Sequence, residues 1–150
     1  MVRRPVPLVV ASISALLTFT AGCSDDATVS AAGDGALIVS HGRGNGGNEA
    51  SIGGPLTWVG SCLGVGGTAT VWPEGTEWDP EASTLTLSGG ATLVLGEQVH
   101  GAGGFTSLDA IASSFGQQAA DDLAECGVGE QDEVALFNVG STVRAGSQPS

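Results

Sequence analysis

The chain contains no lysine and no tyrosine, and its four basic residues are all arginines. Two of them, Arg3 and Arg4, stand at the start, so only Arg43 and Arg144 accompany the sixteen acidic residues of the remaining chain. Binding to nucleic acid and to anionic lipid head groups depends on lysine and arginine. The composition therefore excludes nucleic acid as a partner, and it leaves no lysine amine for covalent catalysis.

Catalytic and metal-binding motifs are also lacking. The only histidines, His41 and His100, form no H-x-H or H-x-x-x-H spacing, and there is no G-x-S-x-G sequence. Acidic residues gather at 74–81 and 121–133, but neither segment has the pattern of a calcium-binding loop. We therefore predict no catalytic residue, no metal ligand and no cofactor. Two alternatives stay open: a hydrolase that uses His41 or His100, and a module that binds cations weakly.

No apolar run is long enough to cross a bilayer comfortably. The longest one, residues 6–20, has about 15 residues, whereas a spanning helix needs about 20. It follows a basic start at residues 1–4 and precedes the small pair Ala21-Gly22. This order is typical of a secretory signal peptide. We therefore expect residues 1–22 to be a signal peptide and not a structural helix.

Cys23 follows directly, and Thr20-Ala21-Gly22-Cys23 resembles the lipobox of bacterial lipoproteins, although that family prefers leucine where this chain has Thr20. The resemblance implies that Cys23 carries a lipid and anchors the protein to the extracytoplasmic face of the cell membrane. An ordinary signal-peptidase site is the alternative, and it would release a soluble protein with a free thiol. Residues 24–35 are small, polar and acidic, so we expect a tether over 23–35 and one domain over 36–150.

The three cysteines fit the same interpretation. If Cys23 carries lipid, Cys62 and Cys126 remain as a pair in an exported, oxidising setting. A bridge between them would close a loop of about 64 residues, which the chain-entropy model associates with about 4 kcal/mol. The alternative is two unrelated buried thiols.

The body of the chain has the pattern of short β-strands. The expected strands are 36–40, 56–65, 68–72, 84–88, 91–95 and 134–139. Gly66-Gly67 and Gly89-Gly90 separate adjacent apolar segments and predict two tight hairpins, because the favoured hairpin turns need positive φ angles. Leu85 and Leu87 alternate with polar residues, as expected for a strand with one buried face.

Two short helices are expected among the strands. In residues 118–126, Ala119, Leu123 and Cys126 share one helical face, and a glycine follows. Ser107 is a suitable N-terminal cap for a second helix that ends at Phe115. The sequence thus predicts a mainly β protein, a small antiparallel barrel or sandwich with one or two short helices and one disulfide.

The aromatic residues are few, and three of them lie close together in sequence. Trp58, Trp72 and Trp78 are the candidate ligand surface, because exposed tryptophans stack on sugars and anchor protein partners. Buried tryptophans would instead fill the core of a small barrel. We expect at least two of the three to belong to the core.

A second resemblance covers roughly residues 55–140. The segments Gly60-Ser61-Cys62-Leu63, residues 71–76, residues 101–104 and Glu125-Cys126 are similar to a group of small envelope proteins of high-GC Gram-positive bacteria. The shared residues are structural, so the resemblance implies fold and compartment but no activity. We expect a non-catalytic envelope module, anchored to the membrane through its lipid, that binds a protein, a glycan or a small ligand.

Overall fold

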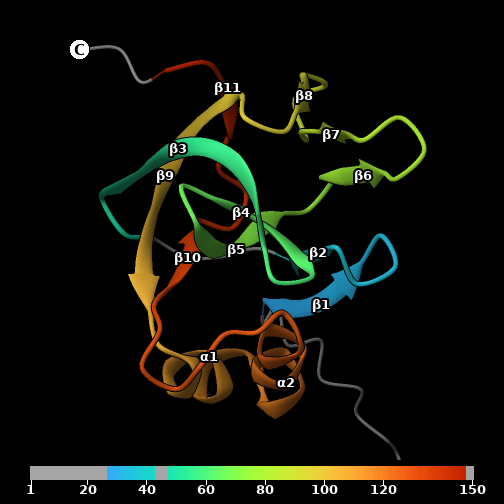
Figure 1. Ribbon diagram of the computed structural model, residues 1–150. Coiled ribbons are helices and arrows are strands. Elements are labelled where there is room, and N and C mark those ends of the chain that lie inside the picture. Colours follow the sequence, from blue (N-terminus) through green and yellow to red (C-terminus); the bar gives the residue numbers. More distant parts are fainter. Residues whose placement is uncertain (1–26, 43–46, 148–150) are drawn as a thin grey trace, which may run out of the picture.

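The computed structural model describes residues 27–42 and 47–147 of the chain. The described part is mainly β, with a closed five-stranded barrel and two helices, as the sequence predicts (Figure 1). The expected signal peptide and the expected lipid-bearing Cys23 lie outside the described residues. Within them, no helix has the length and apolar character needed to cross a membrane.

Five strands close the barrel. They are β3 (Ala50–Val59), β4 (Cys62–Val65), β5 (Thr68–Pro73), β9 (Gln98–Thr106) and β10 (Val134–Phe137). Around the barrel the order is β5-β10-β9-β3-β4, and the pairing of β4 with β5 completes the circle. The β5–β10 pair is parallel and the other four pairs are antiparallel. The antiparallel expectation is therefore right for all but one pair of the barrel.

Two further strands extend the sheet from β5. Strand β2 (Leu37–His41) pairs with β5 in parallel, and β1 (Thr28–Ala32) pairs with β2 in antiparallel fashion. The expected tether over 23–35 is thus wrong from Thr28 onward, because residues 28–35 form a strand and a turn of the domain. The sequence does not predict this strand because Val29 is its only large apolar residue. The Val29 side chain is buried and attaches the strand to the core. Glycines with positive φ, Gly33 and Gly35, form the turn between β1 and β2.

The remaining strands form small additions to the barrel. Strands β6 (Glu77–Asp79), β7 (Thr84–Thr86) and β8 (Thr92–Val94) make a three-stranded antiparallel sheet, and β11 (Arg144–Ala145) pairs with β9. The β7–β8 and β4–β5 hairpins confirm both glycine-pair predictions. The strand expected over 56–65 is instead a hairpin, since the chain turns at Gly60 between β3 and β4.

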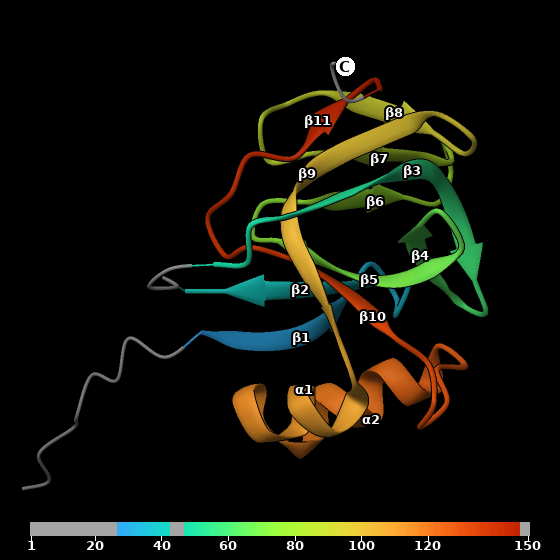
Figure 2. The same ribbon diagram turned by 90° about the vertical axis from the view of Figure 1, so that its left-hand side faces the viewer.

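Both expected helices are present. Helix α1 (Leu108–Phe115) begins after Ser107, whose hydroxyl accepts a hydrogen bond from the Ala110 amide, and α2 (Gln117–Glu125) follows after Gly116. The helices lie together at one end of the molecule, beneath β1 and β10 (Figure 2). They leave the outer face of β3 and β9 uncovered (Figure 2).

Two apolar clusters form the core. The first fills the barrel, and its two largest members are Trp72 and Phe137. The second lies between the helices and the outer face of β1, β2, β5 and β10. Alternation along each strand divides the residues between the two clusters, so that neighbours such as Val71 and Trp72 belong to opposite ones.

The predicted disulfide lies in the second cluster. Cys62 at the start of β4 is bonded to Cys126 at the end of α2, and their Cα atoms are 5.2 Å apart. Both residues are buried. The bridge therefore holds the helical layer to the barrel, and the alternative of two unrelated thiols is excluded.

Candidate functional site

The three tryptophans do not form one exposed surface. Trp72 is completely buried in the barrel, where its indole Nε1 donates a hydrogen bond of 3.1 Å to the Leu63 carbonyl. Its assignment to a ligand surface is therefore wrong, and its role is to fill the core. Trp78 is half-buried against the same core cluster, whereas Trp58 is 44% exposed. The expectation that at least two of the three belong to the core holds for Trp72 and Trp78.

Trp58 and Trp78 nevertheless contact each other. Their ring centroids are 5.5 Å apart and their planes meet at 85°, which is the edge-to-face arrangement that aromatic pairs favour. Strand β3 supplies Trp58 and strand β6 supplies Trp78, so the pair joins the small sheet to the barrel. The rest of the Trp58 ring is an exposed apolar surface beside this contact.

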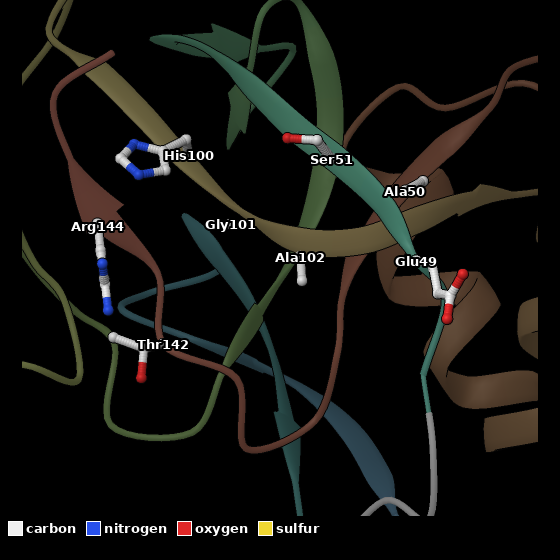
Figure 3. A pocket seen from close by; sticks show the side chains of 8 residues that line it. All are labelled: Glu49, Ala50, Ser51, His100, Gly101, Ala102, Thr142 and Arg144. Atoms are coloured by element: carbon white, nitrogen blue, oxygen red, sulfur yellow. The ribbon is translucent and has the colours of Figure 1, made fainter. Parts of the chain in front are cut away.

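A groove of about 350 Å³ lies on the outer wall of the barrel (Figure 3). Its lining residues are Glu49, Ala50, Ser51, His100, Gly101, Ala102, Thr142 and Arg144. They come from β3, β9, β11 and the segments that precede β3 and β11. Small side chains in the middle leave the hollow, and the larger side chains of His100, Arg144 and Glu49 stand at its ends (Figure 3).

The strand register explains why the polar side chains meet there. Directly paired residues point to the same face of a sheet, and residues two apart on one strand share that face. His100 pairs with Gly53 on one side and with Arg144 on the other, and Ser51 pairs with Ala102. The side chains of Ser51, His100 and Arg144 therefore share the outer face.

His100 is held in place by the segment after β11. Its Nδ1 lies 2.8 Å from the carbonyl oxygen of Gly146. Because a carbonyl oxygen only accepts, Nδ1 must carry the proton, and Nε2 is the nitrogen left for a ligand. In Figure 3 the hydroxyl of Ser51 points to the side on which His100 lies.

Arg144 is the only arginine among the described residues, and it is exposed beside His100. It forms no ion pair with any described carboxylate, although acidic residues outnumber basic ones by sixteen to four in the chain. Glu49 lines the opposite end of the same groove (Figure 3). The groove therefore carries a positive end and a negative end.

The second histidine, His41, belongs to a separate arrangement. Its Nε2 lies 2.9 Å from the Ser30 hydroxyl, and its Nδ1 lies 3.8 Å from a carboxylate oxygen of Glu74. Strands β1 and β2 bring Ser30 and His41 together, and Glu74 follows β5. All three side chains are accessible, with 41% of His41 and 65% of Glu74 exposed. A serine, a histidine and a carboxylate in this order are the components of a nucleophilic site.

The acidic segments do not converge on a metal site. Among the described residues there is no group of three or more histidine, cysteine or carboxylate side chains placed to hold an ion. Some of these carboxylates instead accept hydrogen bonds from backbone amides in turns. Asp79 accepts hydrogen bonds from the Glu81 and Ala82 amides, and Asp132 accepts one from the Gly129 amide.

Comparisons with family models, with curated protein sequences and with solved structures find no match to this chain. The site must therefore be interpreted from its own residues.

Sequence reasoning named His100 and His41 but missed Arg144, Ser51 and Ser30 as their neighbours. Arg144 was visible only as one of two arginines after Cys23, and Ser30 lay in the expected tether. A signal for Arg144 existed in the charge balance, because a rare cation in a strongly acidic chain is a candidate for a specific contact.

Proposed function

We propose that this protein is a non-catalytic module of the bacterial cell envelope, tethered by a lipid on Cys23, that binds its ligand in the groove between β3, β9 and β11. The signal-peptide pattern and the lipobox resemblance support the tether. The buried disulfide is consistent with an oxidising compartment, where such bonds persist.

The observation that carries the proposal is Arg144, which lies beside His100 and forms no ion pair with a carboxylate in the part of the chain that the structure describes. Electrostatics alone would favour a neighbouring carboxylate for a lone guanidinium on so acidic a surface. Instead it stands at one end of a hollow whose wall also offers Ser51 and Thr142. A concave site with a few convergent polar groups is the usual form of a ligand-binding site. Trp58 provides a separate contact surface for an envelope protein or glycan.

A thermal-shift experiment tests the proposal. The full chain, solubilised in detergent, is heated with a panel of amino acids, short peptides and sugars. A ligand that binds the folded state raises the melting temperature, by the equivalent of about 2.7 kcal/mol at a hundredfold excess over its Kd. We expect such a shift to disappear in Arg144→Gln and to persist in Trp58→Ala. Two results would contradict the proposal that the groove is the binding site. One is that no compound of the panel raises the melting temperature, and the other is that Trp58→Ala removes the shift whereas Arg144→Gln does not.

The second candidate is a hydrolase that uses His41. Glu74 attracts the proton of His41 Nδ1, which leaves Nε2 free to accept the proton of the Ser30 hydroxyl. The arrangement ranks second because its groups are open to water. Electrostatic catalysis is strongest where water is excluded.

Reaction of the protein with a fluorophosphonate probe and with p-nitrophenyl acetate tests this candidate. If it is right, the probe labels Ser30, and His41→Ala abolishes turnover while His100→Ala does not. In that case the hydrolase replaces the binding module. No observation on the described residues favours the third alternative, weak cation binding.

A further inference from the structure

We propose that the groove binds a short peptide with a free C-terminus: its carboxylate pairs with Arg144, and a cationic group of the same ligand lies toward Glu49. This inference rests on the proposed function, because it names the ligand class of the same site. Three properties of the groove support it.

The first property is the donor set at the Arg144 end. A guanidinium presents a planar fork of N–H donors that matches a carboxylate or a phosphate in two parallel hydrogen bonds. No described side chain occupies this fork. The neighbouring His100 ring is held through Nδ1 by the Gly146 carbonyl and does not occupy the fork. The end of the groove is therefore built to accept an oxyanion.

The second property is the number of positive charges. Arg144 is the one permanent cation among the described residues, and the chain as a whole is strongly acidic. A phosphate monoester carries close to two negative charges at neutral pH, so up to about half of its charge would remain uncompensated beside one guanidinium. A carboxylate carries a single charge. The charge balance therefore favours a carboxylate over a phosphate.

The third property is the opposite end of the groove. Glu49 is exposed and lines the same hollow (Figure 3). A ligand with only negative groups would meet repulsion there, whereas a ligand with an ammonium group would be attracted. The small residues Ala50, Gly101 and Ala102 lie between the two ends and leave space for an extended chain, with Ser51 and Thr142 as polar contacts. A peptide has charges of opposite sign separated by such a chain.

Amide chemical shifts of the full, isotope-labelled chain in detergent micelles test the inference. The probes are trialanine, its C-terminal amide and its N-acetyl derivative. We expect trialanine to move the amide signals of Ser51, His100 and Ala102. The C-terminal amide should bind at least roughly tenfold more weakly, because a neutral amide cannot form the two charge-assisted hydrogen bonds that a carboxylate forms with a guanidinium. The N-acetyl derivative should keep the Arg144 contact and lose only the attraction to Glu49.

Variants assign each end of the ligand. Arg144→Gln should weaken trialanine and its N-acetyl derivative alike. Glu49→Gln should weaken trialanine but leave the N-acetyl derivative unchanged. Glu81→Gln removes an equal charge outside the groove and should change neither. Since the residues at positions 49, 81 and 144 are exposed, unchanged spectra elsewhere will show that the variants fold.

Any one of three results would overturn the inference. The first is that the C-terminal amide binds as tightly as trialanine, and the second is that Arg144→Gln does not weaken trialanine. The third is that inorganic phosphate binds the same residues more tightly than acetate does. A different result would reject the proposed function itself. If a neutral sugar, and no peptide, shifts the amide signals of the groove residues, the protein is still a binding module but its ligand is not a peptide. If neither the peptides nor any compound of the thermal-shift panel affects the groove, both proposals are rejected.

Discussion

Cys62 and Cys126 join the start of β4 to the end of α2, with 5.2 Å between their Cα atoms, and are the covalent link between the barrel and the helical layer. Each also lies in the apolar cluster between these two layers. The bridge closes a loop that contains the greater part of the barrel, so its loss affects a large share of the unfolded chain.

We predict that replacing both cysteines by alanine lowers the free energy of unfolding by about 2–5 kcal/mol, the usual range for a native disulfide in a small secreted domain. Urea denaturation of the double variant and of the parent measures the difference. Reduction of the parent should reproduce most of the loss. An unchanged denaturation midpoint would show that the bridge does not hold the two layers together.

Trp72 and Trp58 should respond differently to truncation. Trp72 is completely buried and donates a hydrogen bond to Leu63, so Trp72→Ala should cost about 3–5 kcal/mol. Trp58 is 44% exposed and its ring contacts Trp78, so Trp58→Ala should cost only about 1 kcal/mol. If Trp72→Ala does not fold, Trp72→Phe should still unfold at lower urea concentration than the parent. Equal costs for the two tryptophans would contradict the assignment of Trp72 to the core.

Gly60 is required at the turn between β3 and β4. Its φ angle is +58°, and a Cβ atom there would overlap the carbonyl oxygen of Cys126. Gly67 has a similarly positive φ of +83° but open space around it, and it is therefore a matched control. Gly67→Ala should cost about 1–2 kcal/mol for the left-handed backbone alone. Gly60→Ala should cost more, because the backbone beside the disulfide must also move. Thermal denaturation of both variants measures the difference in stability. A smaller decrease in melting temperature for Gly60→Ala than for Gly67→Ala would contradict this prediction.

Local patterns predicted the local elements. Glycine pairs between apolar segments predicted two hairpins, and the face shared by Ala119 and Leu123 predicted α2. Strand β9 was missed because its sequence is rich in glycine and has no clear alternation. The structure explains these glycines, since a Cβ at Gly101 would press on Phe137 and one at Gly103 would overlap the Leu136 carbonyl. Such close approaches depend on the closed barrel and are invisible in the sequence.

The candidate site was predicted only in part. His100 was noticed as a rare titratable residue, but its neighbours depend on the register of three strands that are distant in sequence. Arg144 lies in a two-residue strand that no periodicity indicates. The same applies to Ser30 and His41, which a β1–β2 pairing brings within 2.9 Å of each other. The residue types in the sequence indicated which side chains could bind a ligand or react. Only the pairing of strands in the folded structure showed which of these side chains are neighbours.

The last prediction concerns the tether. Ala21-Gly22-Cys23 follows an apolar run with a basic start, so we expect the mature protein to carry a diacylglycerol group on Cys23. Two acyl chains anchor a protein stably, whereas a single chain gives only reversible binding. Expressed in a bacterial host that processes lipoproteins, the protein should enter the detergent phase and show the corresponding mass increment. Cys23→Ala should leave an uncleaved precursor, while the variant without Cys62 and Cys126 should still enter the detergent phase. A mature, water-soluble product of the native sequence would support the ordinary signal-peptidase site and reject the lipid anchor.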